Sequence, residues 1–177
     1  VEHLGEMELA ATNVIRSVST VFFVIVNSLA ATTGSLVSNL LGAGQKRQVI
    51  PLCNCVVRLG YAIGFPLVIL AVIFYRPIIG IYTESTALMQ IAHLPFVVML
   101  LNYIFALPGY VYMNSVTGTG ATRMTFIFQL ITIVAYQIYL WSISSFSTSL
   151  SVYWTAEYLY VILLGLLSVI YLKYKHY

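Results

Sequence analysis

Five long runs of apolar residues, separated by short polar connections, constrain the fold of this chain more than any other feature. We expect helices over about 9–41, 46–75, 85–117, 122–142 and 152–172. Each run is long enough to cross a bilayer, because a transmembrane helix needs about 20 mainly apolar residues. Only 7% of the residues are charged, and the mean hydropathy is +0.94. The sequence therefore predicts an all-α membrane protein, a bundle of five transmembrane helices.

The composition also excludes several classes of protein. A soluble enzyme or a nucleic-acid-binding domain would carry about 25% charged residues, so we expect no nucleic-acid partner. The strands of an outer-membrane barrel alternate every second residue, whereas these runs are apolar throughout. The first residues hold Glu2, Glu6 and Glu8, where a signal peptide would be basic. Since the sequence starts at Val1 and not at Met, we expect a piece of a longer protein.

Residues that carry chemistry are few. Cys53 and Cys55 would point about 200° apart on a helix, so we expect two small buried apolar residues that share neither a metal nor a disulfide. His93 is a lone candidate ligand close to Pro95, and we expect a local hydrogen bond there. The spans hold no Asp and only one Glu, which is too little for convergent catalytic groups. We therefore expect no metal site, no catalytic residues and no enzymatic activity.

The few charges predict an orientation in the membrane. The end formed by the first and third connections and the C-terminus carries most of the cations, namely Lys46, Arg47, Arg123, Lys173 and Lys175. Basic residues are enriched on the cytoplasmic side of membrane proteins. We therefore expect a cytoplasmic C-terminus, with Glu84 and residues 143–151 facing outward.

Small residues and prolines predict where helices pack and bend. Small side chains recur every four positions at Ala30, Gly34, Ser38 and Gly42, and again at Gly60 and Gly64. Such stripes let helix backbones approach closely in lipid, so we expect helix packing at these positions. Kinks or hinges are expected at the prolines inside the runs, Pro66, Pro95 and Pro108.

Three polar residues inside the apolar runs are candidate ligands for a cation or a substrate. Asn27 belongs to a polar face of the first run, which implies contact with protein or water. Asn102 lies between Pro95 and Pro108, so its amide either binds a ligand or satisfies a carbonyl that a proline leaves free.

Glu157 is the third candidate and the only acid inside an apolar run. It lies about five residues from the helix start and hence ~8 Å deep, where a carboxylate must find a partner, reach water or take up a proton. Its helical neighbours are largely aromatic, Tyr153, Trp154, Tyr160 and Val161. Glu157 either acts inside the bundle or reaches the outer interface beside these aromatic residues.

Several motifs resemble those of the multidrug and toxic compound extrusion (MATE) transporters. Residues 4–11, LGEMELAA, and 34–44, GSLVSNLLGAG, resemble the start of a helix and the turn that ends it in each lobe of that family. Residues 114–120, NSVTGTG, resemble the end of the family's tenth helix. The resemblance implies helices eight to twelve, a partial C-terminal lobe of a twelve-helix, two-lobe transporter.

The family resemblance also implies a function. A cation-coupled multidrug efflux antiporter would work by alternating access between its lobes, in a bacterial inner (plasma) membrane. It would expel amphipathic, often cationic small molecules against Na⁺ or H⁺ and use no other cofactor. Its partners would be the lipid bilayer and the seventh helix and N-terminal lobe of the same protein. Asn39 and Thr117 replace the usual Gln and Arg, and Ala106 stands where many members carry an Asp of a cation site.

Two other functions remain open from the sequence. A lipid-linked saccharide flippase of the same superfamily would need cations in its cavity for a pyrophosphate, and the cations inside the runs are Arg16 and Arg58, toward opposite ends. A non-transporting membrane bundle is the other alternative. The fourteen Tyr, nine Phe and two Trp could line a cavity for flat cations through their π faces, or form belts at the membrane surface.

Overall fold

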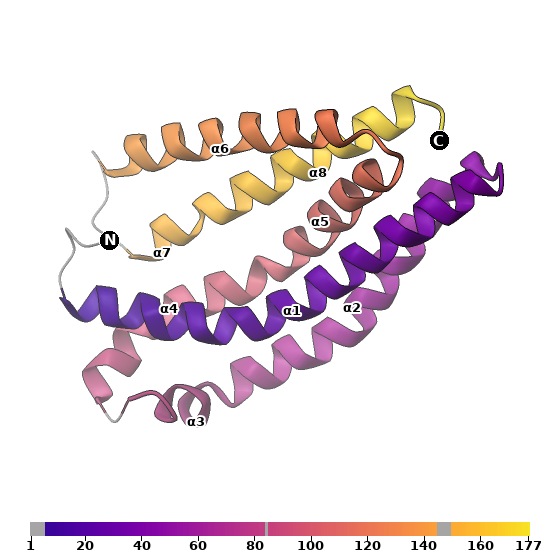
Figure 1. Cartoon of the computed structure of the whole chain (residues 1–177). Helices are drawn as coiled ribbons and strands as arrows, with labels where there is room; N and C mark the ends of the chain where they lie inside the picture. The colour runs from indigo at the N-terminus through magenta and orange to yellow at the C-terminus, as the bar shows by residue number, and fades with distance from the viewer. Residues whose placement is uncertain (1–5, 84, 145–149) are drawn as a thin grey trace.

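The computed structural model describes residues 6–83, 85–144 and 150–177, and all regular structure in them is helical. In chain order the elements are α1 (Glu6–Gly42), η2 (Lys46–Gln48), α2 (Val49–Ile73), α3 (Tyr75–Gly80), α4 (Thr86–Leu101), α5 (Tyr103–Gly118), α6 (Thr122–Ser144), α7 (Leu150–Trp154) and α8 (Ala156–Tyr174). Figure 1 shows the long helices lying side by side. Five stretches are long and apolar enough to cross a membrane: Leu9–Gly42, Lys46–Ile73, Thr86–Gly118, Thr122–Ser144 and Val152–Tyr174. The prediction of an all-α bundle with five transmembrane helices is confirmed.

The third span is not one continuous helix, as the sequence had suggested, but is interrupted at Asn102. The Tyr158 hydroxyl of α8 donates a hydrogen bond to the Val98 carbonyl. That carbonyl also accepts the Asn102 backbone N–H, at 3.2 Å. The Tyr158 contact therefore lies in the turn just before the interruption. Pro95 and Pro108 both remain inside helices, α4 and α5, so the break lies between the two predicted kinks.

The ends of two other expected helices also differ. The second expected helix begins with the short η2 and ends at Ile73, and α3 follows as a separate helix. The last span is divided at Thr155 into α7 and α8. The Thr155 hydroxyl explains this division, because it bonds to the Val152 carbonyl at 2.6 Å and lies 3.1 Å from the Tyr139 hydroxyl of α6.

The α5 helix is the centre of the bundle, in contact with α1, α2, α6 and α8. Its Leu107, Val111 and Val116 are fully buried. Its backbone touches that of α8, because a Cβ added at Gly109 would lie 2.7 Å from the Val161 carbonyl oxygen. Close backbone approach is how membrane helices gain van der Waals contact where lipid supplies no hydrophobic drive.

The predicted packing stripes lie against α5. Ala30 is buried, a Cβ at Gly34 would lie 3.1 Å from the Asn114 carbonyl oxygen, and the Ser38 hydroxyl donates to the Gly118 carbonyl at 2.8 Å. On α2, Gly60 packs against Leu107 and Gly64 against the ring of Tyr103. Gly42 does not take part: it is exposed, and a Cβ there would meet nothing within 4 Å. The reason is that α5 ends at Gly118, beside Gly34, so α1 runs on beyond its partner.

Helices α2 and α6 expose large apolar side chains on their outer surfaces. Examples are Leu59, Ile63, Ile69 and Ile73 on α2, and Phe126, Leu130, Val134 and Ile138 on α6. Extended apolar surfaces of this kind indicate contact with lipid or another protein. Cys55 also lies on the exposed side of α2, so its predicted burial is wrong, whereas Cys53 is buried and its sulfur lies 2.9 Å from the Ser115 hydroxyl.

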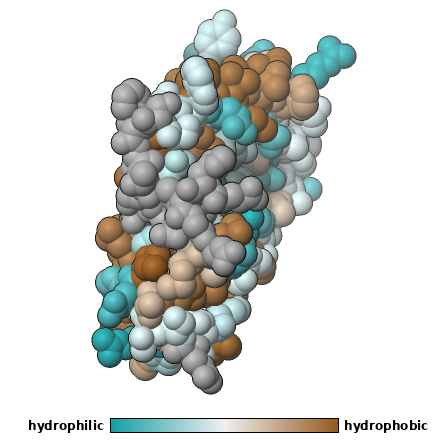
Figure 2. Space-filling view, turned by 90° about the vertical axis from the view of Figure 1, so that its left-hand side faces the viewer, coloured by the Kyte–Doolittle hydropathy of each residue, from teal (hydrophilic) through white to brown (hydrophobic). Residues whose placement is uncertain are grey.

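The two ends of the bundle differ in charge. The connections from α1 to α2 and from α5 to α6, with the C-terminus, lie at one end (Figure 1). We call it the basic end, and its cations are Lys46, Arg47, Arg123, Lys173 and Lys175. The opposite end, which Figure 2 views, holds the start of α1 and the connection from α3 to α4, and shows hydrophilic and hydrophobic residues side by side. The membrane side that each end faces stays a prediction; of the segments expected to face outward, Glu84 and residues 145–149 lie outside the described residues.

Candidate functional site

Glu157 lies at the start of α8, toward the end opposite the basic end, and its side chain is half-buried. The Tyr136 hydroxyl of α6 donates a hydrogen bond to Glu157 Oε1 at 3.4 Å. This is a long hydrogen bond, so the carboxylate retains capacity for a second partner. The contact between Tyr139 and Thr155 holds the start of α8 against α6 and so fixes the position of the acid.

Two adjoining pockets meet at Glu157, and together we call them the Glu157 cavity. The first, of about 370 Å³, is lined by Thr12, Arg16, Tyr136, Gln137, Leu140, Trp141, Ser144, Tyr153, Trp154 and Glu157. The second, of about 380 Å³, is lined by Tyr110, Ile133, Tyr136, Gln137, Glu157 and Tyr160. Both volumes lie in the range of about 300–1,000 Å³ that is typical of small-molecule sites. The walls come from α1, α5, α6, α7 and α8.

The chemistry of the Glu157 cavity suits a cation with an apolar body. The rings of Tyr136 and Tyr160 lie 6.2 Å apart and meet edge to face, and aromatic faces attract cations. The carboxylate adds a negative charge where the surrounding span is apolar. Arg16 of α1 lines the same cavity without a direct ion pair to Glu157, since no nitrogen–oxygen distance between them is within 4.0 Å. The lining of this cavity therefore contains both a cation and an acid.

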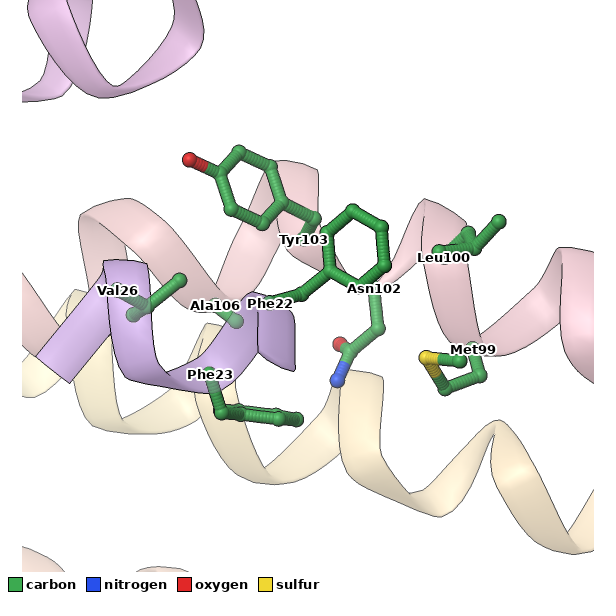
Figure 3. A pocket seen from close by; sticks show the side chains of 8 residues that line it. All are labelled: Phe22, Phe23, Val26, Met99, Leu100, Asn102, Tyr103 and Ala106. Atoms are coloured by element: carbon green, nitrogen blue, oxygen red, sulfur yellow. The ribbon is translucent and has the colours of Figure 1, made fainter. Parts of the chain in front are cut away.

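Asn102 lies in a separate and much smaller cavity. Its side chain is 3% exposed, and its Oδ1 has no hydrogen-bond partner in the structure. The cavity has a volume of about 10 Å³ and is lined by Phe22, Phe23, Val26, Met99, Leu100, Asn102, Tyr103 and Ala106. Figure 3 shows the amide directed between Phe23 and Met99, away from the Tyr103 hydroxyl. This space is close to the size needed for one water molecule.

The carbonyl that Pro108 leaves free is satisfied by a tyrosine and not by Asn102. Pro108 has no N–H for the carbonyl of Ile104, four residues before it. The Tyr61 hydroxyl of α2 donates to that carbonyl at 2.5 Å. In return, the Tyr103 hydroxyl of α5 donates to the Gly60 carbonyl of α2 at 2.8 Å. We call these two contacts the tyrosine pair.

The other predicted residues are dispersed. Asn27 is exposed on α1 and lines neither the Glu157 cavity nor the cavity at Asn102. Pro66 is exposed in α2, and Pro95 is buried in α4. His93 is exposed, and its ring lies 4.9 Å from that of Tyr75 in an edge-to-face contact rather than in a local hydrogen bond. Over the described ranges, no group of three or more His, Cys, Asp or Glu is placed to hold a metal ion.

Sequence reasoning did not find the residues that surround Glu157 from other helices. Arg16 was noted only as a cation near one end of its run, and Tyr136 and Gln137 only as part of the fourth run. Their signal was weak: two neighbouring polar residues, Tyr136 and Gln137, sit in an otherwise apolar segment. The pairing of α1, α6 and α8 around them depends on the tertiary fold.

The comparisons with known proteins agree with this architecture. The model of one family, MatE, matches residues 1–141, which run from the start of the chain almost to the end of α6. Neither the curated proteins nor the solved structures give a match. The family match covers well over half of the sequence and confirms the resemblance carried by the glycine-rich motifs. The chain therefore belongs to the MatE family, a family of membrane transporters.

Proposed function

We propose that this chain is part of a cation-coupled efflux antiporter for amphipathic, mostly cationic organic molecules, and that Glu157 is its cation-binding acid. The observation that carries the proposal is the place of Glu157, which is the only acidic residue within the five candidate spans and lies half-buried in an aromatic cavity. Membership of a transporter family supports transport as the activity. The acid and the aromatic rings of the cavity support a cation as the bound ligand.

The exchange follows from electrostatics in a partly buried site. A half-buried carboxylate in an apolar span binds one compensating cation at a time, Na⁺, H⁺ or the cationic group of a substrate, because leaving the charge unpaired is costly. Arg16 favours release of a bound cation, since it lines the same cavity with the opposite charge. Alternating access of two lobes would then turn this competition into antiport, with the seventh helix and the N-terminal lobe as partners of this chain.

We also propose that the Asn102 side chain binds one small occupant of its cavity. The cavity at Asn102 has room for a single water molecule or ion and not for an organic substrate. Its Oδ1 is the acceptor that such an occupant would meet. Asn27 remains a proposed polar contact for a cation or substrate on the exposed face of α1.

The test compares Glu157→Gln with Glu157→Asp in the transporter that contains this chain. Efflux of a fluorescent aromatic cation is measured in cells against external pH and Na⁺, at equal expression. We expect Glu157→Gln to lose the ion dependence and at least about tenfold in rate, and Glu157→Asp to keep part of both. Wild-type rate and ion dependence in Glu157→Gln would contradict the proposal.

A second function is favoured by Arg16. A guanidinium lining the Glu157 cavity could bind the pyrophosphate of a lipid-linked saccharide, as a flippase of the same superfamily would require. In that case Arg16→Gln abolishes transport of the lipid in reconstituted vesicles, while Glu157→Gln does not. The antiporter predicts the reverse, namely that Glu157→Gln is the more damaging change.

The proposed setting is a bacterial inner membrane with the basic end in the cytoplasm. The side of the membrane follows from the rule that basic residues stay cytoplasmic. The exposed apolar surfaces of α2 and α6 support a position in the bilayer. In this orientation the Glu157 cavity lies toward the outer half of the membrane.

A further inference from the structure

A third hollow lies on the side of the bundle between α3 and α4, and no part of the proposed transport cycle uses it. It has a volume of about 530 Å³ and is lined by Val72 and Ile73 of α2, Tyr75 and Arg76 of α3, and Thr86, Met89, Gln90 and His93 of α4. We call it the α3–α4 groove. No residue of this groove lines the Glu157 cavity.

The polar side of the α3–α4 groove is built from hydrogen-bond donors. Arg76, Thr86, Gln90 and His93 are all exposed. A guanidinium carries five N–H donors in a fixed fork, and a hydroxyl, an amide and an imidazole each add at least one more. Among the described residues that line the groove, none is acidic. A permanent positive charge together with several donors favours an anion, and a guanidinium fits phosphate with two parallel hydrogen bonds.

The other side of the groove is apolar and open. Val72 is 40% exposed and Ile73 is 67% exposed, and Leu94, one residue after His93, is 60% exposed. The groove also lies at a boundary of the apolar region, because Ile73 ends the second candidate span and Thr86 begins the third. Donors therefore lie at the level of the membrane surface, directly beside apolar side chains that belong to the bilayer.

The walls of the groove are held together before any ligand binds. The Tyr75 hydroxyl of α3 donates a hydrogen bond to the Met89 carbonyl of α4. The ring of His93 packs against the ring of Tyr75 at an interplanar angle of 88°. Each helix is also anchored in the bundle by a buried side chain. Ile79 of α3 is fully buried, and Leu88 of α4 is 6% exposed. Preformed walls lower the entropy that a ligand must lose on binding.

We propose that the α3–α4 groove binds a phospholipid with an anionic headgroup, with its phosphate on Arg76 and its acyl chains along Val72 and Ile73. The donors would bind the phosphate, and the exposed apolar side chains would contact the acyl chains of the lipid. A free phosphate ion would bind the donors and leave the apolar side chains exposed. A zwitterionic lipid would bring an ammonium group beside Arg76, which is a repulsive pair.

The test measures lipid retention by the purified full chain. The protein is exchanged into mild detergent with equal amounts of dioleoyl phosphatidylglycerol and dioleoyl phosphatidylcholine, and bound lipids are counted by native mass spectrometry. The variants are Arg76→Gln, Arg76→Lys and Gln90→Glu, and Arg123→Gln at the basic end is the matched control. We expect the wild-type chain to prefer phosphatidylglycerol by about tenfold, the scale of one charge-assisted hydrogen bond.

The variants decide between this site and general attraction to basic residues. Arg76→Gln should remove the preference, Arg76→Lys should retain part of it, and Arg123→Gln should retain all of it. Gln90→Glu should lower phosphatidylglycerol retention and leave phosphatidylcholine unchanged, which tests the groove without touching Arg76. Equal retention of both lipids by the wild type, or an equal loss in Arg76→Gln and Arg123→Gln, would overturn the proposal. Displacement of the lipid by an equal concentration of inorganic phosphate would show a phosphate site without acyl contacts and would overturn it too.

Discussion

The tyrosine pair between α2 and α5 leads to an asymmetric prediction. Its two hydrogen bonds look alike, since each runs from a phenol to a carbonyl of the other helix, from Tyr61 to Ile104 and from Tyr103 to Gly60. The two carbonyls differ in what else they can bind. Gly60 lies inside α2, so its carbonyl faces the N–H of Gly64 four residues on. The carbonyl of Ile104 faces Pro108, which has no N–H.

This difference sets the magnitudes expected for the two Tyr→Phe variants, each of which removes one hydroxyl. Tyr103→Phe loses one of two hydrogen bonds to a carbonyl, and such bonds between membrane helices contribute about 0.6 kcal/mol on average. Tyr61→Phe leaves a carbonyl without its partner in apolar surroundings, which costs about 1–3 kcal/mol. Tyr61→Phe should therefore destabilise the chain by at least twice as much as Tyr103→Phe.

The assay is unfolding by sodium dodecyl sulfate in mixed micelles, followed by circular dichroism. A third variant isolates the cause, because Pro108→Ala restores an N–H for the carbonyl of Ile104. In that background Tyr61→Phe should cost about as little as Tyr103→Phe does in the wild type, about 0.6 kcal/mol. Equal losses for the two tyrosines in the wild-type chain, or no relief by Pro108→Ala, would refute the reasoning.

Two further predictions concern packing and topology. Gly109→Ala places a Cβ 2.7 Å from the Val161 carbonyl oxygen, and overpacking of this kind costs about 1–3 kcal/mol. The control is Gly42→Ala, whose Cβ meets nothing within 4 Å and which should be neutral or stabilising in the same unfolding assay. Equal effects of the two variants would contradict the packing of α5 on α8. Cysteines at Gln45 and Ile81, in a chain without Cys53 and Cys55, should react with an impermeant thiol reagent from opposite sides of the membrane; labelling from the same side would contradict the five-span topology.

The number and placement of the spans could be predicted from the sequence because they depend on local apolar content alone. Twenty apolar residues in a row have few alternatives to a membrane helix, since every backbone polar group in lipid must be satisfied internally. The stripes at Gly34 and Gly60 were predictable for a similar reason, as a missing side chain permits close approach whatever the partner helix is. The partner itself, α5 in both cases, was not visible in either stripe.

The interruptions and the site were harder to predict because both depend on residues distant in sequence. Prolines mark where a carbonyl is left free, but the break at Asn102 lies one turn after the carbonyl that Tyr158 of another helix contacts. Likewise, Glu157 was identifiable as an unusual acid, whereas Arg16 and Tyr136 join it only through the packing of α1 and α6 near α8. A charge or an aromatic residue gives no local sign of the helix that it will face.

The position of the Glu157 cavity follows from how unevenly the helices are packed. The α5 helix meets α1 and α8 through glycines, with backbone against backbone at Gly34 and Gly109. In contrast, α6 packs chiefly on α8 and meets it through longer side chains such as Tyr136 and Tyr139. In lipid, no hydrophobic gain drives such a gap to close, so a polar hollow persists where side chains hold two helices apart. A cation that binds Glu157 there shares the carboxylate with the Tyr136 hydroxyl, and therefore acts directly on one of the contacts that join α6 to α8.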